Sequence, residues 1–116
     1  MAMLADNIFL KIINKEIPAK IVHEDDRCLA FYDIAAKAPV HVLIIPRKVI
    51  RTHDDITEED AALLGHLHVV ARKVAGELGL ADGYRLVVNC KERAQQSVPH
   101  LHLHLLGGRD FTWPPG

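Results

Sequence analysis

The residues best suited to carry out chemistry are three histidines at alternate positions, His100, His102 and His104, with leucines between and after them. Successive side chains of a β-strand point to opposite faces, so this spacing puts the imidazoles on one face and the leucines on the other. Imidazole has an unperturbed pKa of about 6.5 and can act as nucleophile, acid or base near neutrality. The segment 100–106 is therefore interpreted as a catalytic or ligand-binding strip on a strand.

Two kinds of site could use such a strip. Zinc needs three or four ligands around one point at about 2.0–2.3 Å, whereas positions i, i+2 and i+4 of a strand spread over about 13 Å. A zinc protein using His100, His102 and His41 stays open as the weaker interpretation. Phosphoryl or acyl transfer with His102 attacking fits better, because crowded imidazoles resist simultaneous protonation and one of them stays neutral.

The remaining histidines are interpreted by their neighbours in the sequence. His41 interrupts an otherwise apolar predicted strand, so it is either a satisfied core histidine or a partner for the strip. His66 and His68 fall on opposite borders of the apolar stripe of a predicted helix and are interpreted as surface residues. His23 and His53 lie beside turns, where we expect structural or solvent-facing roles.

The elements that must position the strip follow the order α-β-β-β-α-β-β. A long helix is predicted from the N-cap Thr57 to the C-cap Gly79, because apolar residues recur at helical spacing between them. A short N-terminal helix is predicted over 8–14, and strands over 21–24, 28–33, 40–45, 84–89 and 101–106. The expected fold is α+β, an antiparallel five-stranded sheet with one long helix packed on a face.

Composition limits the class of protein. The 116 residues suit a single domain, 1–116, and a formal net charge of -1 argues against nucleic acid or an anionic membrane as the main partner. Cys28 and Cys90 are interpreted as reduced thiols in strands.

The opening residues 1–5 are too short for a signal peptide and no apolar run reaches membrane-spanning length, so a cytoplasmic location is expected.

Further motifs accompany the histidines. His100-Leu-His102-Leu-His104-Leu-Leu matches the pattern His-φ-His-φ-His-φ-φ, where φ is apolar. The other matching segments are Asp6-Asn-Ile-Phe9, Lys15-Glu-Ile-Pro-Ala-Lys20, Glu24-Asp-Asp-Arg-Cys-Leu-Ala-Phe31, Asp33-Ile34, Pro39-Val-His41, Ile45-Pro46, Asn89, Gln96-Ser97-Val98, Gly107-Gly108-Arg109 and Trp113-Pro-Pro-Gly116. From Asp6 onward the chain resembles the histidine triad (HIT) family, in particular its HINT branch of histidine triad nucleotide-binding proteins.

The resemblance implies a HIT fold, with the sheets of two subunits joined across a homodimer. It also implies a purine nucleoside phosphoramidase that uses no metal and no other cofactor. Such an enzyme hydrolyses the P–N bond of adenosine or guanosine 5′-phosphoramidates, releasing AMP or GMP and an amine through a covalent nucleotidyl-histidine intermediate. The implied partners are the purine nucleotide and a second copy of the chain.

Site residues follow from the same resemblance. The implied catalytic set is His102 as nucleophile, His104 and His100 contacting the phosphate and relaying protons, His41 completing a tetrad, and Ser97 beside the leaving group. The implied nucleotide-binding set is Ile8, Phe9, Ile12, Phe31 and Ile34 around the purine, Asp33 on the ribose, Asn89 near ribose and phosphate, the Val98 backbone on phosphate oxygens, and Trp113 reaching toward the partner subunit's site. By spacing alone, the apolar members are core residues.

Two positions depart from the family pattern. Gln95 stands where glycine is common, and glycine permits backbone conformations that glutamine resists. Pro99 stands where a bulky residue is frequent, and proline lacks the N–H of a central strand residue. We therefore expect the chemistry to survive while leaving-group preference shifts. Two other functions stay open, a non-catalytic purine nucleotide-binding regulator and a dinucleotide polyphosphate hydrolase.

Overall fold

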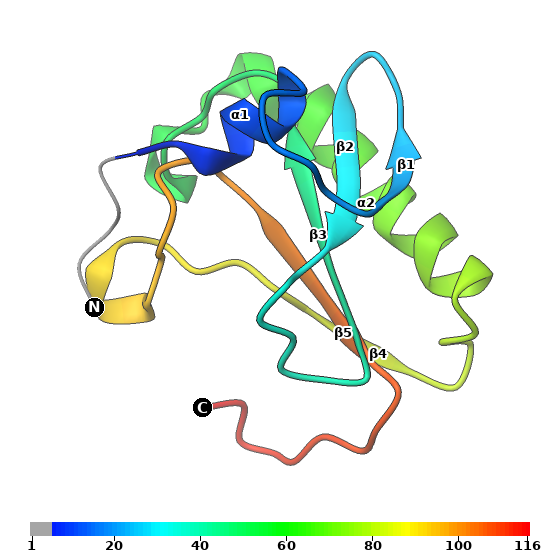
Figure 1. Ribbon diagram of the computed structural model, residues 1–116. Coiled ribbons are helices and arrows are strands. Elements are labelled where there is room, and N and C mark those ends of the chain that lie inside the picture. Colours follow the sequence, from blue (N-terminus) through cyan, green and yellow to red (C-terminus); the bar gives the residue numbers. More distant parts are fainter. Residues whose placement is uncertain (1–5) are drawn as a thin grey trace.

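The computed structural model describes residues 6–116, so the expectation about a signal peptide in residues 1–5 lies outside the described residues. The elements are α1 (Ile8–Ile13), β1 (Ile21–Glu24), β2 (Cys28–Tyr32), β3 (Val40–Pro46), α2 (Ala61–Glu77), β4 (Tyr84–Val87) and β5 (Leu103–Gly107) (Figure 1). Single-turn 3-10 helices lie at His53–Asp55 (η1), Glu58–Asp60 (η2) and Glu92–Ala94 (η3). The predicted α+β order is confirmed.

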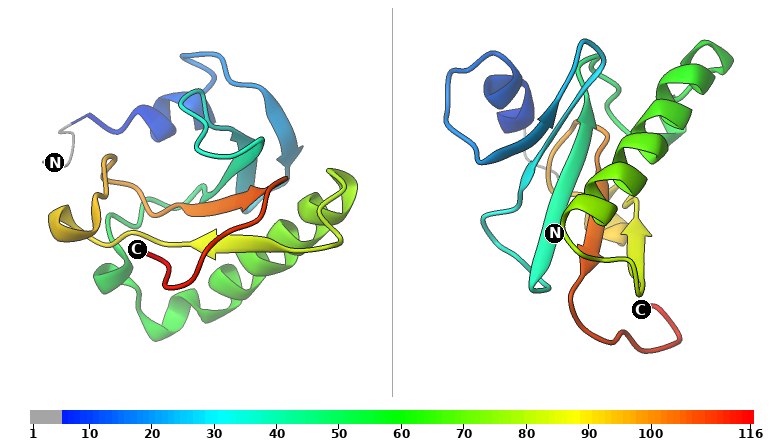
Figure 2. Two further views of the ribbon diagram at one scale, coloured as in Figure 1. Left: turned by 90° about the horizontal axis from the view of Figure 1, so that it is seen from below. Right: turned by 90° about the vertical axis from the view of Figure 1, so that its right-hand side faces the viewer.

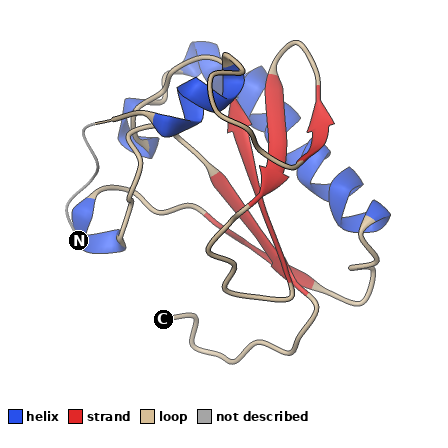
Figure 3. Ribbon diagram, viewed as in Figure 1, coloured by secondary structure: helices blue, strands red, loops and turns tan. Residues whose placement is uncertain are grey.

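The strands form one antiparallel sheet in the order β1-β2-β3-β5-β4, which confirms the predicted five-stranded sheet. Figure 2 shows that α1 lies over one face of this sheet and α2 over the other. Figure 3 shows the long loops gathered at the ends of the strands. The α1 face and the α2 face therefore carry separate cores.

Both cores draw on alternate residues of the central strands. Phe31 and Leu43 pack with α1, whereas Ala30 and Ile44 pack with α2, and all four are buried. Because both faces are covered, β2 and, apart from His41, β3 are apolar along their length instead of alternating with polar residues. Each fully buried large aliphatic side chain contributes about 1.5–3 kcal/mol through its removal from water.

The start and the end of α2 follow local sequence signals. Thr57 caps the 3-10 turn η2 and not α2 itself, and its N–H donates to Oδ2 of Asp60 at 3.0 Å. The α-helix begins at Ala61, four residues after the predicted cap. At the other end Gly79 has φ +77°, and the N–H of Leu80 donates to the carbonyl of Ala75 at 2.9 Å. The C-cap is therefore Leu78, and Gly79, the predicted cap, is the left-handed residue directly after it. No helix within residues 6–116 combines the length and hydropathy needed to cross a bilayer.

The histidine strip lies on a strand only in part, which corrects the predicted strand 101–106. β5 begins at Leu103, so among the three histidines only His104 is a strand residue. The β3–β5 ladder ends at the pair Ile44 and Leu103, although β3 itself continues to Pro46. The N–H of Leu101 donates instead to the carbonyl of Ile50, in the loop after β3, at 2.6 Å.

Two further interpretations need correction. β4 ends at Val87, so Cys90 lies half-buried in the following loop, whereas Cys28 is buried in β2 as predicted; both are free thiols. His66, interpreted from the sequence as a surface residue, is half-buried, and its Nε2, like that of His23, lies 2.7 Å from Oδ2 of Asp25. Packing of α2 beside the β1–β2 turn brings them together, and sequence spacing does not reveal such a contact.

Candidate active site

A cavity of about 230 Å³ opens on the α1 face of the sheet. The residues of the implied site that line it are Ile8, Phe9, Ile12, Phe31, Asp33, Ile34, Ser97, Val98, His102 and His104. Sequence reasoning missed the other lining residues, Ile17, Pro18, Ala19, Tyr32 and Leu43. Leu43 could have been found, since it follows His41 by two positions on one strand and so shares its face.

Four residues of the implied site lie elsewhere. His100 and His41 are buried and are not part of the cavity lining. Asn89 is half-buried beyond the end of β4, also away from the lining. The Trp113 side chain is 81% exposed, and the guanidinium of Arg85 lies 5.9 Å from the centre of its ring.

His100 is an anchor whose two ring nitrogens are both engaged. Its Nε2 lies 2.7 Å from the carbonyl oxygen of Pro46, and since a carbonyl only accepts, we assign the proton to Nε2. Its Nδ1 accepts from the side-chain amide of Asn7 at 2.9 Å, and the Asn7 Oδ1 accepts from the N–H of Leu10. His100 therefore has no free nitrogen for a metal, which removes the zinc set of His100, His102 and His41.

His102 has the opposite arrangement, with one free nitrogen. Its Nδ1 lies 2.7 Å from the backbone carbonyl of His100, so the proton belongs on Nδ1 and the lone pair on Nε2. The ring is 4% exposed, lines the cavity and meets the ring of Phe9 edge to face at 4.9 Å. A neutral imidazole held this way offers Nε2 as a nucleophile.

His41 is a partner for the strip, which decides between the two alternatives left open by its sequence position. The backbone N–H of Lys37 donates to Nδ1 of His41 at 3.0 Å, so the His41 proton is on Nε2. That nitrogen lies 2.9 Å from Nδ1 of His104 and donates to it. The proton of neutral His104 is therefore on Nε2, a buried atom with no hydrogen-bond partner within residues 6–116.

Burial keeps these four imidazoles uncharged near neutral pH. It is the main cause that lowers the pKa of His41, His100 and His102 below the ordinary value. Burial, together with the neighbouring His102 and His41, lowers the pKa of His104 to about 4. The nearby carboxylate of Asp33 opposes these shifts only in part. The cluster therefore presents one lone pair, on His102, beside one N–H donor, on His104.

A metal ion does not suit this face of the sheet. The donor atoms of Asp33, His41 and His104 lie within 4.8 Å of one another, and His41 Nε2 is 3.5 Å from Asp33 Oδ2. A neutral His41 that bound a metal through Nε2 would carry its proton on Nδ1. That proton would face the donating N–H of Lys37. The existing hydrogen bonds therefore oppose coordination by His41.

The loop before the histidines is held in a strained conformation. Gln95 adopts the left-handed region at φ +67°, which is the conformation that glycine would accept without strain, and Lys91 is at φ +68°. The buried Gln96 compensates through its side-chain amide, which accepts from the Lys91 N–H and donates to the carbonyls of Arg51 and Val98 at 2.8 and 3.0 Å. This amide therefore fixes the backbone next to Ser97 and Val98.

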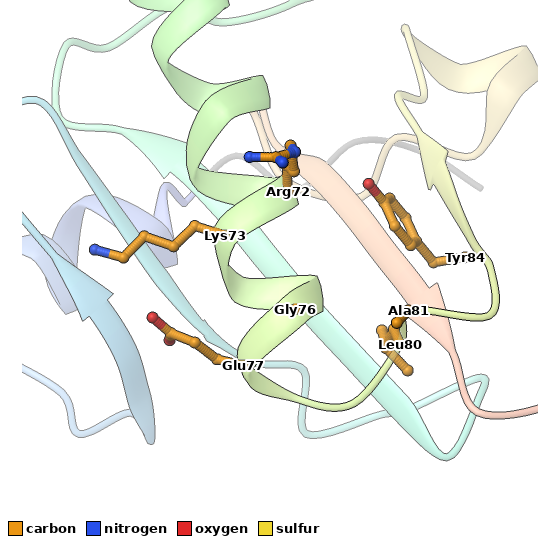
Figure 4. Close-up of a pocket in the computed structure, with 7 residues that line it drawn as sticks. All are labelled: Arg72, Lys73, Gly76, Glu77, Leu80, Ala81 and Tyr84. Atoms are coloured by element: carbon orange, nitrogen blue, oxygen red, sulfur yellow. The ribbon is translucent and has the colours of Figure 1, made fainter.

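A second depression, of about 580 Å³, lies between the end of α2 and the start of β4 (Figure 4). Its lining includes the exposed residues Arg72, Lys73, Glu77 and Tyr84. In Figure 4, Lys73 and Glu77 extend away from Tyr84, so the charged groups do not converge on one point. We therefore assign the candidate active site to the histidine cavity.

Comparison with known proteins finds a family whose model matches most of the chain. The HIT domain family matches residues 14–111. An uncharacterised HIT-like protein of Synechocystis is 57% identical over 114 residues, which cover 98% of this chain and 100% of that protein.

Two solved structures have the same fold. A HIT family hydrolase from Legionella pneumophila superposes with a TM-score of 0.93 at 50% identity, covering 96% of this chain and 100% of that chain. The histidine triad nucleotide-binding protein of Candida albicans gives a TM-score of 0.80 at 31% identity, covering 96% and 85%. The match over most of its length and the shared fold show that this chain belongs to the histidine triad (HIT) family.

Proposed function

We propose that this protein is a purine nucleoside phosphoramidase of the HINT branch, with His102 as its nucleophile. The observation that carries the proposal is the neutral His102 ring, whose Nε2 lone pair is free on the wall of an apolar cavity. A nucleophile in this setting needs no base to activate it, because burial has already lowered its pKa.

The proposed reaction has two steps. Nε2 of His102 attacks the phosphorus and forms a P–N bond, while the bond from phosphorus to the substrate amine breaks and the amine nitrogen takes a proton from solvent as it leaves. Water then attacks the phosphorus of the nucleotidyl-histidine, the bond from phosphorus to Nε2 breaks, and a proton of the water returns to solvent, which releases the nucleoside monophosphate and restores the free imidazole. The His104 Nε2–H supplies a hydrogen bond to the phosphoryl oxygens, where negative charge develops.

The remaining members of the cluster hold these two groups in place. His41 fixes the His104 tautomer through the bond between their rings, and its own tautomer depends on the Lys37 N–H. In this proposal His100 is a positioning residue, since its backbone carbonyl holds His102 Nδ1 and its ring is anchored to Asn7. Ser97, which lines the cavity, is assigned to the leaving-group side.

The cavity wall suits a nucleoside. The rings of Phe9 and Phe31 and the side chains of Ile8 and Ile12 provide an apolar surface for a purine. Asp33 lies at one side of this surface with a carboxylate oxygen for the ribose hydroxyls. Ile34 is fully exposed at the rim of the cavity, where a bound base would cover it.

A homodimer belongs to the same proposal. β4 is an edge strand, and Tyr84, Leu86 and Val88 on or beside it are exposed large hydrophobic residues. Exposed apolar residues on an unpaired edge favour pairing with a second chain. Asn89 and Trp113, which do not line the cavity of their own chain, are assigned roles that the dimer completes. Two free thiols favour a cytoplasmic location.

The test compares substrates and variants in the presence of a metal chelator. Wild type should hydrolyse adenosine 5′-monophosphoramidate faster than a diadenosine polyphosphate, and His102→Ala should lose this activity while it still binds AMP. Turnover of the diadenosine polyphosphate alone would favour the dinucleotide hydrolase. AMP binding without turnover of either compound would favour a nucleotide-binding regulator.

A further inference from the structure

A second cluster of donor groups lies on the α2 face of the sheet, away from the cavity. It consists of His23 on β1, Asp25 in the β1–β2 turn, Cys28 on β2 and His66 on α2. One donor atom from each residue lies within 4.8 Å of all the others. The proposed phosphoramidase chemistry uses none of these four residues.

The hydrogen bonds show that the donor atoms converge. Oδ2 of Asp25 lies 2.7 Å from His23 Nε2, 2.7 Å from His66 Nε2 and 3.5 Å from Cys28 Sγ. A tetrahedral zinc ion with bonds of about 2.0–2.3 Å separates its ligand atoms by roughly 3.3–3.7 Å. The distance from Asp25 to Cys28 lies within that range and the two distances from Asp25 to the imidazoles are shorter, so a small outward movement of the imidazoles would make room for the ion.

The backbone already orients the carboxylate for this role. Oδ1 of Asp25 accepts from the N–H groups of Arg27 and Cys28, both at 2.8 Å, which leaves Oδ2 directed at the cluster. The side chain of Arg47 donates to the backbone carbonyl of Asp25 at 2.7 Å and holds the turn from its other side. Hydrogen bonds that fix a ligating carboxylate in this way are typical of metal sites.

The chemistry of the donors selects the metal. Two imidazoles, one thiolate and one carboxylate suit zinc, whereas calcium and magnesium prefer oxygen ligands alone. The two anionic ligands would neutralise the charge of Zn²⁺, which suits a site between a buried cysteine and partly exposed polar residues. The side chains of His23, Asp25 and His66 are 17–24% exposed, so an ion can enter from solvent.

We propose that His23, Asp25, Cys28 and His66 form a structural zinc site that ties α2 to the β1–β2 turn. On binding, the Cys28 thiol loses its proton to solvent and each imidazole ligates through Nε2 with its proton on Nδ1. Because four protein ligands fill a tetrahedral shell, the site leaves no open position for a substrate. Its function is to stabilise the fold, and it does not depend on the reaction at His102.

The test uses the full chain, stripped of metal by a chelator and titrated with Co²⁺ and then Zn²⁺. Wild type should bind one equivalent of Co²⁺, with the absorption of tetrahedral cobalt and a thiolate-to-cobalt charge-transfer band, and Zn²⁺ should displace it. Bound Zn²⁺ should also raise the melting temperature. His66→Gln should weaken zinc binding by about 100-fold or more, because one ligand is lost.

Matched variants separate this site from other histidines. His68→Gln, two positions along the same helix and exposed, should bind metal like wild type, and so should His102→Ala. Cys28→Ser should remove the charge-transfer band; if that buried substitution prevents folding, Asp25→Asn serves instead and should weaken binding. The proposal is overturned if binding is unchanged in His66→Gln, is lost in His102→Ala, or is absent from wild type.

Discussion

The two faces of the sheet carry two clusters of imidazoles that differ in what their ring nitrogens contact. On the α1 face, the nitrogens of His100 and His102 bond to backbone carbonyls and an amide, and His41 bonds to His104. On the α2 face, His23 and His66 both point at one carboxylate oxygen. Neutral partners hold imidazoles neutral and fix their tautomers, whereas a carboxylate and a thiol favour a cation at the centre.

This contrast indicates that a histidine's role depends more on its partners than on its burial. Free lone pairs and N–H groups that face an apolar cavity allow covalent chemistry. Donor atoms that converge on one another allow a bound ion instead. Both arrangements are built on the two faces of one sheet.

The largest expected difference between the two faces is catalytic. His102→Ala should lower kcat/KM for adenosine 5′-monophosphoramidate by roughly 10⁴-fold or more, because it removes the proposed nucleophile. His23→Ala, on the other face, should change kcat/KM by no more than about 2-fold. Steady-state kinetics on both variants in chelator measure the difference. Comparable losses of kcat/KM in the two variants would contradict the assignment of catalysis to the α1 face alone.

The next largest expected effect is a loss of stability in acid, which comes from His104 on the α1 face. The His104 pKa is lowered to about 4, so below about pH 6.5 the unfolded chain binds a proton that the folded protein does not, and stability falls as pH decreases. For His104 alone, the free energy of unfolding should drop by about 2 kcal/mol between pH 7 and pH 5. Urea denaturation at the two pH values measures it. A slope that His104→Gln leaves unchanged would contradict the assignment.

An effect of similar size should follow from removal of the His100 anchor. Asn7→Ala deletes both the α1 N-cap and the donor to His100 Nδ1, and should lower the free energy of unfolding by about 2 kcal/mol. Asn14→Ala, at the other end of the same helix, provides the control and should cost much less. Equal losses in the two variants, measured by chemical denaturation, would show that the bond to His100 contributes little.

The smallest expected effect concerns the strained loop. Gln95→Gly should raise the free energy of unfolding by about 0.5–1 kcal/mol, since glycine accepts the left-handed conformation at φ +67° without strain. Ala94→Gly, one position earlier in η3, should instead destabilise the protein. Thermal melts of both variants test the pair, and a destabilised Gln95→Gly would contradict the strain assigned to Gln95.

The parts of the molecule that the sequence predicts are those set by local periodicity. Alternation places Leu103 and Leu105 in the α2 core and His104 on the opposite face, and the apolar stripe and Gly79 delimit most of α2. Two contacts between distant residues were missed, whereas the contact of His41 with the strip is one of the two alternatives that its sequence position leaves open. Asn7 meets His100 across 93 positions, and Asp25 meets His66 across 41. Neither spacing repeats a helical or strand period, so only the folded chain reveals these contacts.

The start of β5 illustrates the same limit within one motif. Alternation in the sequence continues back to His100, but the strand does not. The ladder with β3 ends at Ile44 and Leu103, and the N–H of Leu101 donates to the carbonyl of Ile50 in a loop instead. The side chains that the pattern groups together therefore divide into an anchor, His100, and the two cavity residues His102 and His104. That division depends on tertiary partners.

The most direct test of the central claim is mass spectrometry of the protein mixed briefly with adenosine 5′-monophosphoramidate and quenched in the millisecond range. The account predicts a transient mass increase of one AMP moiety on wild type, located at His102 by fragmentation and absent from His102→Ala. An adduct on another residue, or AMP release with no adduct in rapidly quenched wild type, would contradict it.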